Sequence, residues 1–193
     1  MTTFLLAAGL IALAEIGDKT QLLSLFLAAR YRRPVPILIG ILIATLVNHA
    51  LASVLGSQVG ALFTPDQLRW GVGGLFLLMG AWVLIPDRLD EDPEPSPRLG
   101  VLGTTLVLFF LAEMGDKTQI ATVGLAAQQG QWFAVTCGTT LGMLLANAPV
   151  VLLGDRLARR LPLKIIRTIA ALSFILLGLG VLMGAMGAAA FSG

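Results

Sequence analysis

The sequence predicts an all-α polytopic membrane protein with six transmembrane helices that form two inverted three-helix repeats. Of its 193 residues, 56% are hydrophobic and only 12% are charged, which is too little polar surface for a water-soluble protein. Six apolar segments are long enough to span a lipid bilayer, and one eight-residue stretch occurs twice, 98 residues apart. The basic residues lie in short loops, so no nucleic-acid-binding face is expected.

The six apolar segments give the positions of the expected helices. At a rise of 1.5 Å per residue, segments of this length cover most or all of the roughly 30 Å hydrocarbon core of a bilayer. Basic and turn-forming residues separate them, as at 30–34, 64–66 and 159–162. We expect transmembrane helices near residues 4–29, 35–62, 69–85, 100–127, 132–153 and 165–189.

A short acidic stretch divides the chain into two halves. Residues 86–98 read Pro-Asp-Arg-Leu-Asp-Glu-Asp-Pro-Glu-Pro-Ser-Pro-Arg, which is too acidic and too rich in proline to cross a membrane or to pack. We therefore expect a first repeat at 1–85, a solvated cytoplasmic linker at 86–99 and a second repeat at 100–193. Shifting the sequence by 98 residues aligns Gly40 with Gly138 and Gly80 with Gly178 without a gap.

The orientation follows from the number of helices and from the basic residues. Three helices per repeat is an odd number, so the second repeat enters the membrane in the opposite direction. Positive charge concentrates on the cytoplasmic side of membrane proteins, and both termini should therefore lie outside the cytoplasm. Ten of the thirteen basic residues follow the first, third and fifth helices: Arg30, Arg32, Arg33, Arg88, Arg98, Arg156, Arg159, Arg160, Lys164 and Arg167.

The repeated stretch supplies the candidate functional residues. It reads Ala-Glu-Ile-Gly-Asp-Lys-Thr-Gln at 14–21 and Ala-Glu-Met-Gly-Asp-Lys-Thr-Gln at 112–119. On a continuous helix the Glu and the Asp share one face, and the two copies meet near mid-bilayer. Six ionisable residues there would cost roughly 15–20 kcal/mol if they were unpaired. The candidate cation ligands are Glu15, Asp18, Thr20, Gln21, Glu113, Asp116, Thr118 and Gln119, with Lys19 and Lys117 as charge-balancing residues.

This set of side chains indicates a hard divalent cation. Four carboxylates and two ammonium groups carry a net charge of minus two, which one divalent cation neutralises. Oxygen ligands without nearby cysteine or histidine pairs favour Ca²⁺, Mn²⁺ or Mg²⁺ over Zn²⁺ or Cu⁺. Because cation binding requires deprotonated oxygens, such a cluster can exchange a metal ion for protons.

Several alternatives remain open at this point. The charges can instead form structural ion pairs, Glu15 with Lys19 and Glu113 with Lys117, that join helices without transport. Gly17 and Gly115 either allow close helix packing, which we expect, or mark a local break in the helix. His49 either relays protons or forms hydrogen bonds between helices.

The motif Glu-x-Gly-Asp-Lys-Thr, present twice in a six-helix chain with a charged central loop, resembles the Gdt-type cation/proton exchanger family. The resemblance covers essentially the whole chain. It implies export of Mn²⁺ or Ca²⁺ from the cytosol in exchange for protons, with the motif residues as ligands and with no cofactor and no enzymatic activity. The short loops of the chain resemble those of bacterial members of the family, which implies that the protein lies in the bacterial inner membrane. A six-helix exporter of an organic cation such as a basic amino acid is the second hypothesis, and a membrane scaffold that does not transport is the third.

Overall fold

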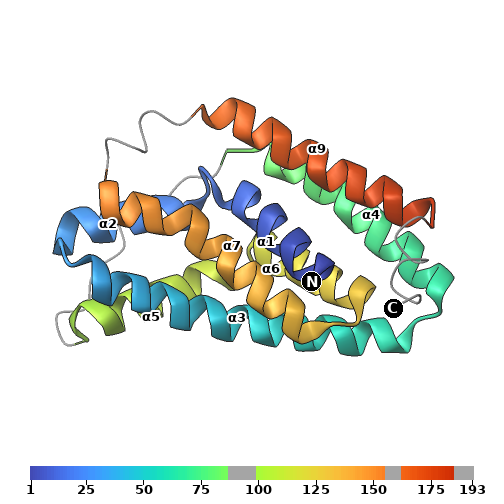
Figure 1. The fold of residues 1–193 in the computed structure, drawn as a ribbon, viewed down its shortest axis with the longest axis horizontal. Helices are drawn as coiled ribbons and strands as arrows, with labels where there is room; N and C mark the ends of the chain where they lie inside the picture. The colour runs from blue at the N-terminus through green and yellow to red at the C-terminus, as the bar shows by residue number, and fades with distance from the viewer. Residues whose placement is uncertain (87–98, 155–161, 185–193) are drawn as a thin grey trace.

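The computed structural model describes residues 1–86, 99–154 and 162–184, and these residues form only helices and connecting turns (Figure 1). Most of the expected linker, 87–98, lies outside the described residues. The all-helical class is confirmed. The eight helices of the described part are α1 (Thr2–Glu15), α2 (Lys19–Tyr31), α3 (Pro34–Leu62), α4 (Pro65–Val83), α5 (Gly100–Glu113), α6 (Lys117–Gln129), α7 (Trp132–Leu153) and α9 (Leu163–Leu182).

The expected helices at 4–29 and 100–127 are each broken into two at the motif. Gly17 and Gly115 have φ angles of 84° and 75°, a left-handed conformation that glycine adopts at little cost. The next residue in each copy, Asp18 or Asp116, is the N-cap of the following helix. Local unwinding is therefore correct for both glycines. The expected close packing is wrong for Gly115, where an added Cβ would meet nothing within 4 Å, whereas Gly17 lies close to Leu163 of α9. The expectation that Glu15 and Asp18 share one face of a continuous helix is wrong because the helix is broken between them.

The helices of the two halves begin at equivalent positions. The starts of α2 and α6 (19 and 117), of α3 and α7 (34 and 132) and of α4 and α9 (65 and 163) all differ by 98 residues. In the first and fourth expected spans, α1 and α5 also end at equivalent residues, 15 and 113. The sequence repeat is thus a repeat of local structure as well.

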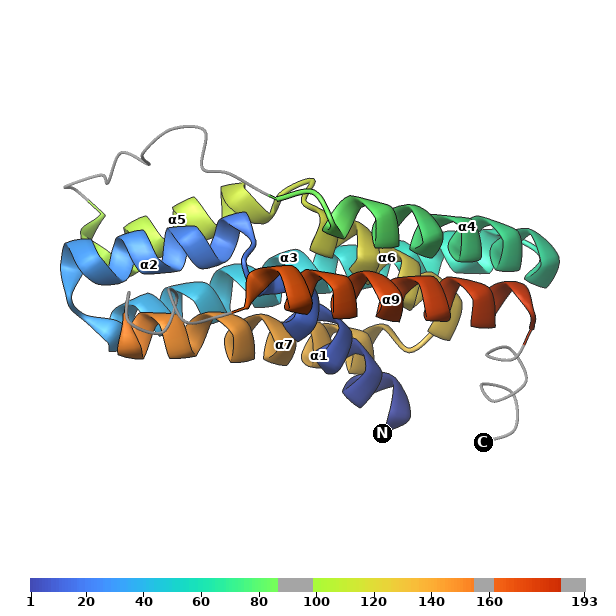
Figure 2. The ribbon, with the colours of Figure 1, turned by 90° about the horizontal axis from the view of Figure 1, so that it is seen from above.

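The packing joins helices from opposite halves of the chain. Helix α1 of the first half lies along α7 of the second. Helix α3 contacts α5, α6 and α7, and α4 packs beside α9 (Figures 1 and 2). Close approach is possible because small residues lie at the crossings. A Cβ added to Gly142 of α7 would be 2.5 Å from the Ala8 carbonyl oxygen of α1, and one added to Gly178 of α9 would be 2.9 Å from the Gly73 carbonyl oxygen of α4. Gly142 and Gly178 therefore lie at tight helix crossings.

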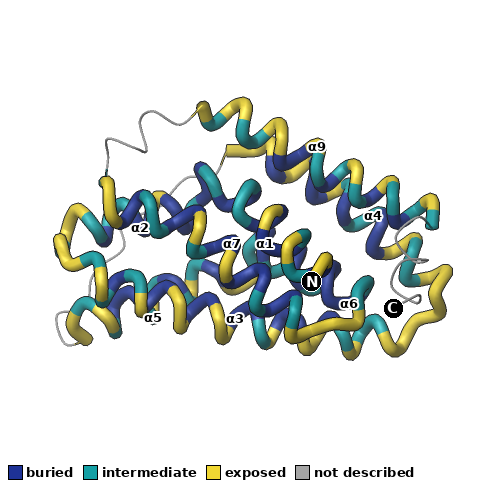
Figure 3. The backbone as a smooth tube through the Cα atoms, viewed as in Figure 1, coloured by how far each residue is buried: buried dark blue, intermediate teal, exposed yellow. Residues whose placement is uncertain are grey.

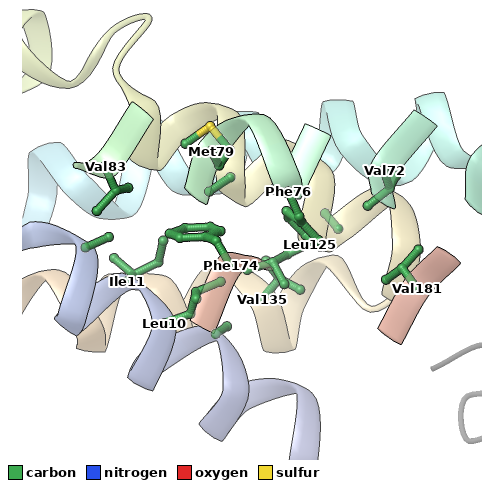
Figure 4. Packing of buried hydrophobic residues seen from close by; sticks show 14 of the residues in the cluster. Leu10, Ile11, Val72, Phe76, Met79, Val83, Leu125, Val135, Phe174 and Val181 are labelled. Carbon is green, nitrogen blue, oxygen red and sulfur yellow. The ribbon is translucent and has the colours of Figure 1, made fainter. Parts of the chain in front are cut away.

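Two apolar clusters fill the interior. The first lies among α1, α4, α6, α7 and α9 and includes Phe76 and Phe174, whose ring centroids are 6.2 Å apart (Figure 4). The second lies among α2, α3, α5 and α7 and includes Leu27, Ile41 and Phe109. The buried sides of the helices face inward (Figure 3). Each cluster draws residues from both halves of the sequence, so the two halves share one interior.

The outer surface is apolar, as a bilayer requires. Large apolar side chains such as Leu46, Leu51 and Leu176 are 43%, 60% and 68% exposed, whereas many polar side chains are buried. In the described residues, α3, α7 and α9 are long and apolar enough to cross a membrane, and α1 and α5 are shorter apolar helices. The chain is therefore a helical membrane protein.

Candidate cation-binding site

Three carboxylates meet where the broken helices face each other. Glu15 and Glu113 are the last residues of α1 and α5, and Asp116 is the N-cap of α6. One oxygen from each carboxylate lies within 4.8 Å of the other two. Two oxygens that bind the same Ca²⁺ are at most about 5 Å apart, because Ca–O distances are roughly 2.3–2.6 Å. The spacing therefore fits a single cation bound by all three residues.

Each of these carboxylates also has a buried oxygen without a hydrogen-bond partner. The three atoms are Oε1 of Glu15, Oε2 of Glu113 and Oδ2 of Asp116. Burying an unpaired carboxylate oxygen is costly unless the group is neutralised or binds a cation. These three oxygens without hydrogen-bond partners thus mark the place where a bound cation or protons would stabilise the fold.

The helix breaks place the C-terminal ends of α1 and α5 and the N-terminal end of α6 at this site. The C-terminal ends of α1 and α5 carry partial negative charge from carbonyl groups that lack helical partners. Broken helices bring such carbonyl ends to the cation sites of membrane transporters. The negative ends of α1 and α5 therefore add to the attraction of a cation by Glu15 and Glu113.

The motif threonines and glutamines hold the two breaks in the same way. Thr20 donates a hydrogen bond to Glu15, and Thr118 donates to Oε1 of Glu113 at 2.6 Å. Gln21 Oε1 accepts from the Gly17 N–H at 2.8 Å, and the equivalent distance from Gln119 Oε1 to the Gly115 nitrogen is 2.7 Å. These bonds orient both glutamates and satisfy backbone groups that the breaks expose.

The fourth carboxylate of the motif forms an ion pair instead. Asp18 Oδ1 is 2.7 Å from Lys117 Nζ, and both side chains are buried. The pair joins the two copies of the motif. The alternative ion pairs, from Glu15 to Lys19 and from Glu113 to Lys117, are not among the ion pairs of the described residues. Lys19 is partly buried and belongs to no ion pair within the described ranges.

Buried polar residues of α2, α3 and α7 also form hydrogen bonds between helices, and one of them contacts a motif carboxylate. His49, fully buried on α3, places Nε2 3.3 Å from Oε1 of Glu113. Asn48 donates to the Phe110 carbonyl at 3.1 Å, and Ser24 donates to Oδ1 of Asn147 at 2.6 Å. The sequence identified His49 as unusual but gave no reason to place it beside Glu113, because α3 and α5 belong to different halves.

Comparison with known proteins gives the family of this chain. The family model described as the divalent cation/proton antiporter GDT1 matches residues 3–91 and 101–189. A protein of Vibrio cholerae serotype O1 named "Putative manganese exporter" is 51% identical over 180 residues, covering 93% of this chain and 90% of that protein. A GDT1-like protein of Synechocystis sp. is 32% identical over 197 residues, covering 91% of this chain and 94% of its own.

A more distant relative is GDT1-like protein 3 of Arabidopsis thaliana, which is 27% identical over 193 residues, with 86% of this chain and 65% of that protein covered. No solved structure matches the chain. The matched family consists of transporters, in which the metal is a substrate and no enzymatic cofactor is involved. The doubled motif, the broken helices and these matches together show that the chain belongs to the GDT1 family of divalent cation/proton antiporters.

Proposed function

We propose that this protein exports Mn²⁺ from the cytosol in exchange for protons, with Ca²⁺ as the second candidate ion. The observation that carries the proposal is the group of three carboxylates, each with one buried oxygen that has no hydrogen-bond partner. Such a group binds a cation when it is deprotonated and releases the cation when it is protonated. Metal and protons thereby compete for the same oxygens, and this competition couples their movement.

The proposed ligands are Glu15, Glu113 and Asp116. The hydroxyl groups of Thr20 and Thr118 orient the two glutamates, and their oxygens are available as further ligands. Gln21 and Gln119 support the helix breaks, which places their amide oxygens beside the site. Asp18 and Lys117 neutralise each other next to the cation, and Lys19 is the second charge-balancing residue.

We further propose six membrane spans in two inverted repeats, 1–85 and 100–193, joined by the cytoplasmic linker 86–99. In this arrangement α1 with α2, and α5 with α6, each form one broken span. Support comes from helix starts that differ by 98 residues and from the family matches at 3–91 and 101–189, whose starts also differ by 98. Both termini then lie outside the cytoplasm of a bacterial cell, and ten of the thirteen basic residues lie inside.

One observation favours Mn²⁺ over Ca²⁺. The Vibrio cholerae relative, 51% identical, is named for manganese export. The imidazole of His49 lies 3.3 Å from Glu113 and orients one of the proposed ligands.

The test is proton movement in proteoliposomes on addition of Mn²⁺, Ca²⁺ or Mg²⁺ separately. We expect Mn²⁺ to drive proton flux in the parent protein, and we expect Glu15→Gln and Glu113→Gln each to abolish it. Lys164→Gln is the control, since it removes an exposed charge far from the carboxylates in sequence and introduces the same amide. Normal flux in both glutamate variants would show that the site lies elsewhere.

The same vesicles distinguish the other hypotheses. An exporter of organic cations predicts flux with lysine or arginine and none with the metals. A scaffold predicts no flux with any substrate from protein that is shown to be folded by size-exclusion chromatography. The scaffold hypothesis does not explain why three buried carboxylate oxygens lack hydrogen-bond partners.

A further inference from the structure

The two helix breaks have the same backbone conformation but different surroundings. Gly17 is buried, and a Cβ added to it would lie 3.0 Å from the Leu163 side chain and 3.4 Å from Nη2 of Arg167. Gly115 is exposed, and a Cβ added there would meet nothing within 4 Å. The N-terminal part of α9 thus covers the first break, and the second break has no such cover in the described residues.

The contact that covers the first break is a hydrogen bond from an arginine. Arg167 Nη2 donates to the Gly17 carbonyl at 3.2 Å. A carbonyl released by a helix break inside a membrane needs a partner, because lipid offers none. Arg167 therefore stabilises the break at Gly17, which lies between Glu15 and Asp18 in the chain.

An equivalent arginine occurs in the other half. Arg69 is 98 residues before Arg167, and each is the fifth residue of its helix, α4 or α9. Arg69 instead lines a cavity of about 560 Å³ between the ends of α3, α4, α6 and α9. Its Nη2 is 3.4 Å from the exposed Asp66, and its buried Nε has no partner. The break at Gly115 is the counterpart of the break at Gly17, but it lacks a hydrogen bond from an arginine of the described residues.

We propose that Arg69 and Arg167 are alternating positioning residues of the transport cycle. In the state described here, Arg167 holds the break at Gly17. In the opposite-facing state, α4 covers the second break, Arg69 donates to the Gly115 carbonyl, and Arg167 withdraws from Gly17. The inference rests on the inverted repeats and the cation exchange proposed above, since equivalent sequences in the two halves can adopt each other's arrangement.

The pairing of α4 with α9 explains why the two contacts exclude each other. These helices pack at Gly73 and Gly178, where an added Cβ on Gly178 would be 2.9 Å from the Gly73 carbonyl oxygen. Phe76 and Phe174 also meet between them, with ring centroids 6.2 Å apart (Figure 4). A closely packed pair moves as one unit, so a shift that brings Arg69 to its break carries Arg167 away from the other.

Cross-linking tests the two states directly. In a Cys137→Ser background, Gly17→Cys with Leu163→Cys reports the present state, and Gly115→Cys with Pro65→Cys reports the equivalent contact in the other. A short thiosulfonate cross-linker should join both pairs in cycling protein, and joining either pair should stop exchange. Failure of the second pair to react while the unlinked protein turns over would overturn the proposal, as would failure of the first.

Arginine variants provide the second readout. We expect Arg69→Gln and Arg167→Gln to lower the exchange rate roughly ten- to hundredfold, the effect of losing a hydrogen bond from a charged group. Mn²⁺ binding in detergent should change little, and Arg69→Lys should restore part of the rate. Asp66→Asn is the matched control, because it removes the ion pair with Arg69 and leaves the guanidinium available.

The two proposals fail in different ways. Absence of exchange with every metal in the parent protein would contradict the proposed function, whereas the cross-linking result depends on geometry and on no particular substrate. Equal loss of exchange in Arg69→Gln and Asp66→Asn would show that Arg69 serves only its ion pair with Asp66. Normal exchange in Arg69→Gln would also overturn the alternating role.

Discussion

At the scale of single residues, the pair of Asp18 and Lys117 ties the two copies of the motif together. The two groups are 2.7 Å apart, and both side chains are buried. Removing one member of a buried pair leaves an uncompensated charge, which costs about 3–5 kcal/mol, whereas removing both costs less. We expect Asp18→Asn or Lys117→Gln alone to lower the midpoint of thermal unfolding strongly, and the double variant to recover much of the loss.

This cycle is measured by thermal unfolding of the detergent-solubilised protein. Lys19→Gln is the matched control, because it changes the equivalent residue of the first motif, which belongs to no ion pair in the described ranges. Additive effects of the two single substitutions would show that the pair contributes no coupling energy.

His49 is the second residue whose role is visible at this scale. Its Nε2 is 3.3 Å from the Glu113 carboxylate, and its Nδ1 is buried without a partner. Groups that orient a metal ligand typically change affinity about 10–100-fold when they are removed. We expect His49→Asn to weaken Mn²⁺ binding by a factor in this range in isothermal titration calorimetry.

Ser53→Ala is the control for His49, because Ser53 is also fully buried and lies one turn further along α3. We expect this variant to bind Mn²⁺ as the parent does. Equal loss of affinity in the two variants would point to a general disturbance of α3 and would contradict a specific role for His49.

At the scale of secondary structure, the crossing of α1 and α7 depends on the absence of side-chain atoms. A Cβ at Gly142 would lie 2.5 Å from the Ala8 carbonyl oxygen and 2.9 Å from the Ala12 nitrogen, both backbone atoms that cannot move independently. Overpacking of this kind typically costs about 1–3 kcal/mol. We therefore expect Gly142→Ala to lower the unfolding midpoint in detergent.

Gly9→Ala in α1 is the matched control, since a Cβ there meets nothing within 4 Å. Alanine is the better helix former by roughly 1 kcal/mol, so this variant should be as stable as the parent or more stable. A Gly142→Ala protein as stable as Gly9→Ala would mean that α1 and α7 do not approach as closely as described.

At the scale of the whole molecule, the interior forms between the halves and not within them. The main packing partners are α1 with α7, α3 with α5 and α6, and α4 with α9, which all join the first half to the second. Each half alone would expose the buried faces of these helices. We expect residues 1–92 or 93–193 expressed alone to be degraded or to aggregate, and the two fragments expressed together to restore exchange.

The control for this experiment is a split inside α3 after Ser57, which interrupts a continuous helix. We expect that pair of fragments to remain inactive. Stable, monomeric half-proteins would show that each repeat contains an interior of its own, against the interlocked packing seen in Figures 1 and 2.

The sequence by itself determined the class of the molecule, the repeat and most of the candidate site. Apolar composition is a property of the chain that no packing can reverse, and it predicted a helical membrane protein. Two copies of one motif at a spacing of 98 residues predicted Glu15, Asp18, Glu113 and Asp116 as candidate ligands, because ionisable residues inside apolar segments are costly unless they serve a function. The Gly-Asp steps also carried a signal for the helix breaks that our expectation of a continuous helix missed, since glycine tolerates a left-handed conformation and aspartate is a common N-cap residue.

Only the tertiary structure decided which of these residues act together. Sequence spacing places Glu15 nearest to Asp18 and Lys19, but the break at Gly17 turns the chain, and α1 and α5 bring Glu15 to Glu113 and Asp116. Asp18 pairs with Lys117, and His49 reaches Glu113, across more than 60 residues of sequence in each case. These contacts depend on how helices of one half pack against the other, and packing of this kind leaves no periodic pattern in the sequence.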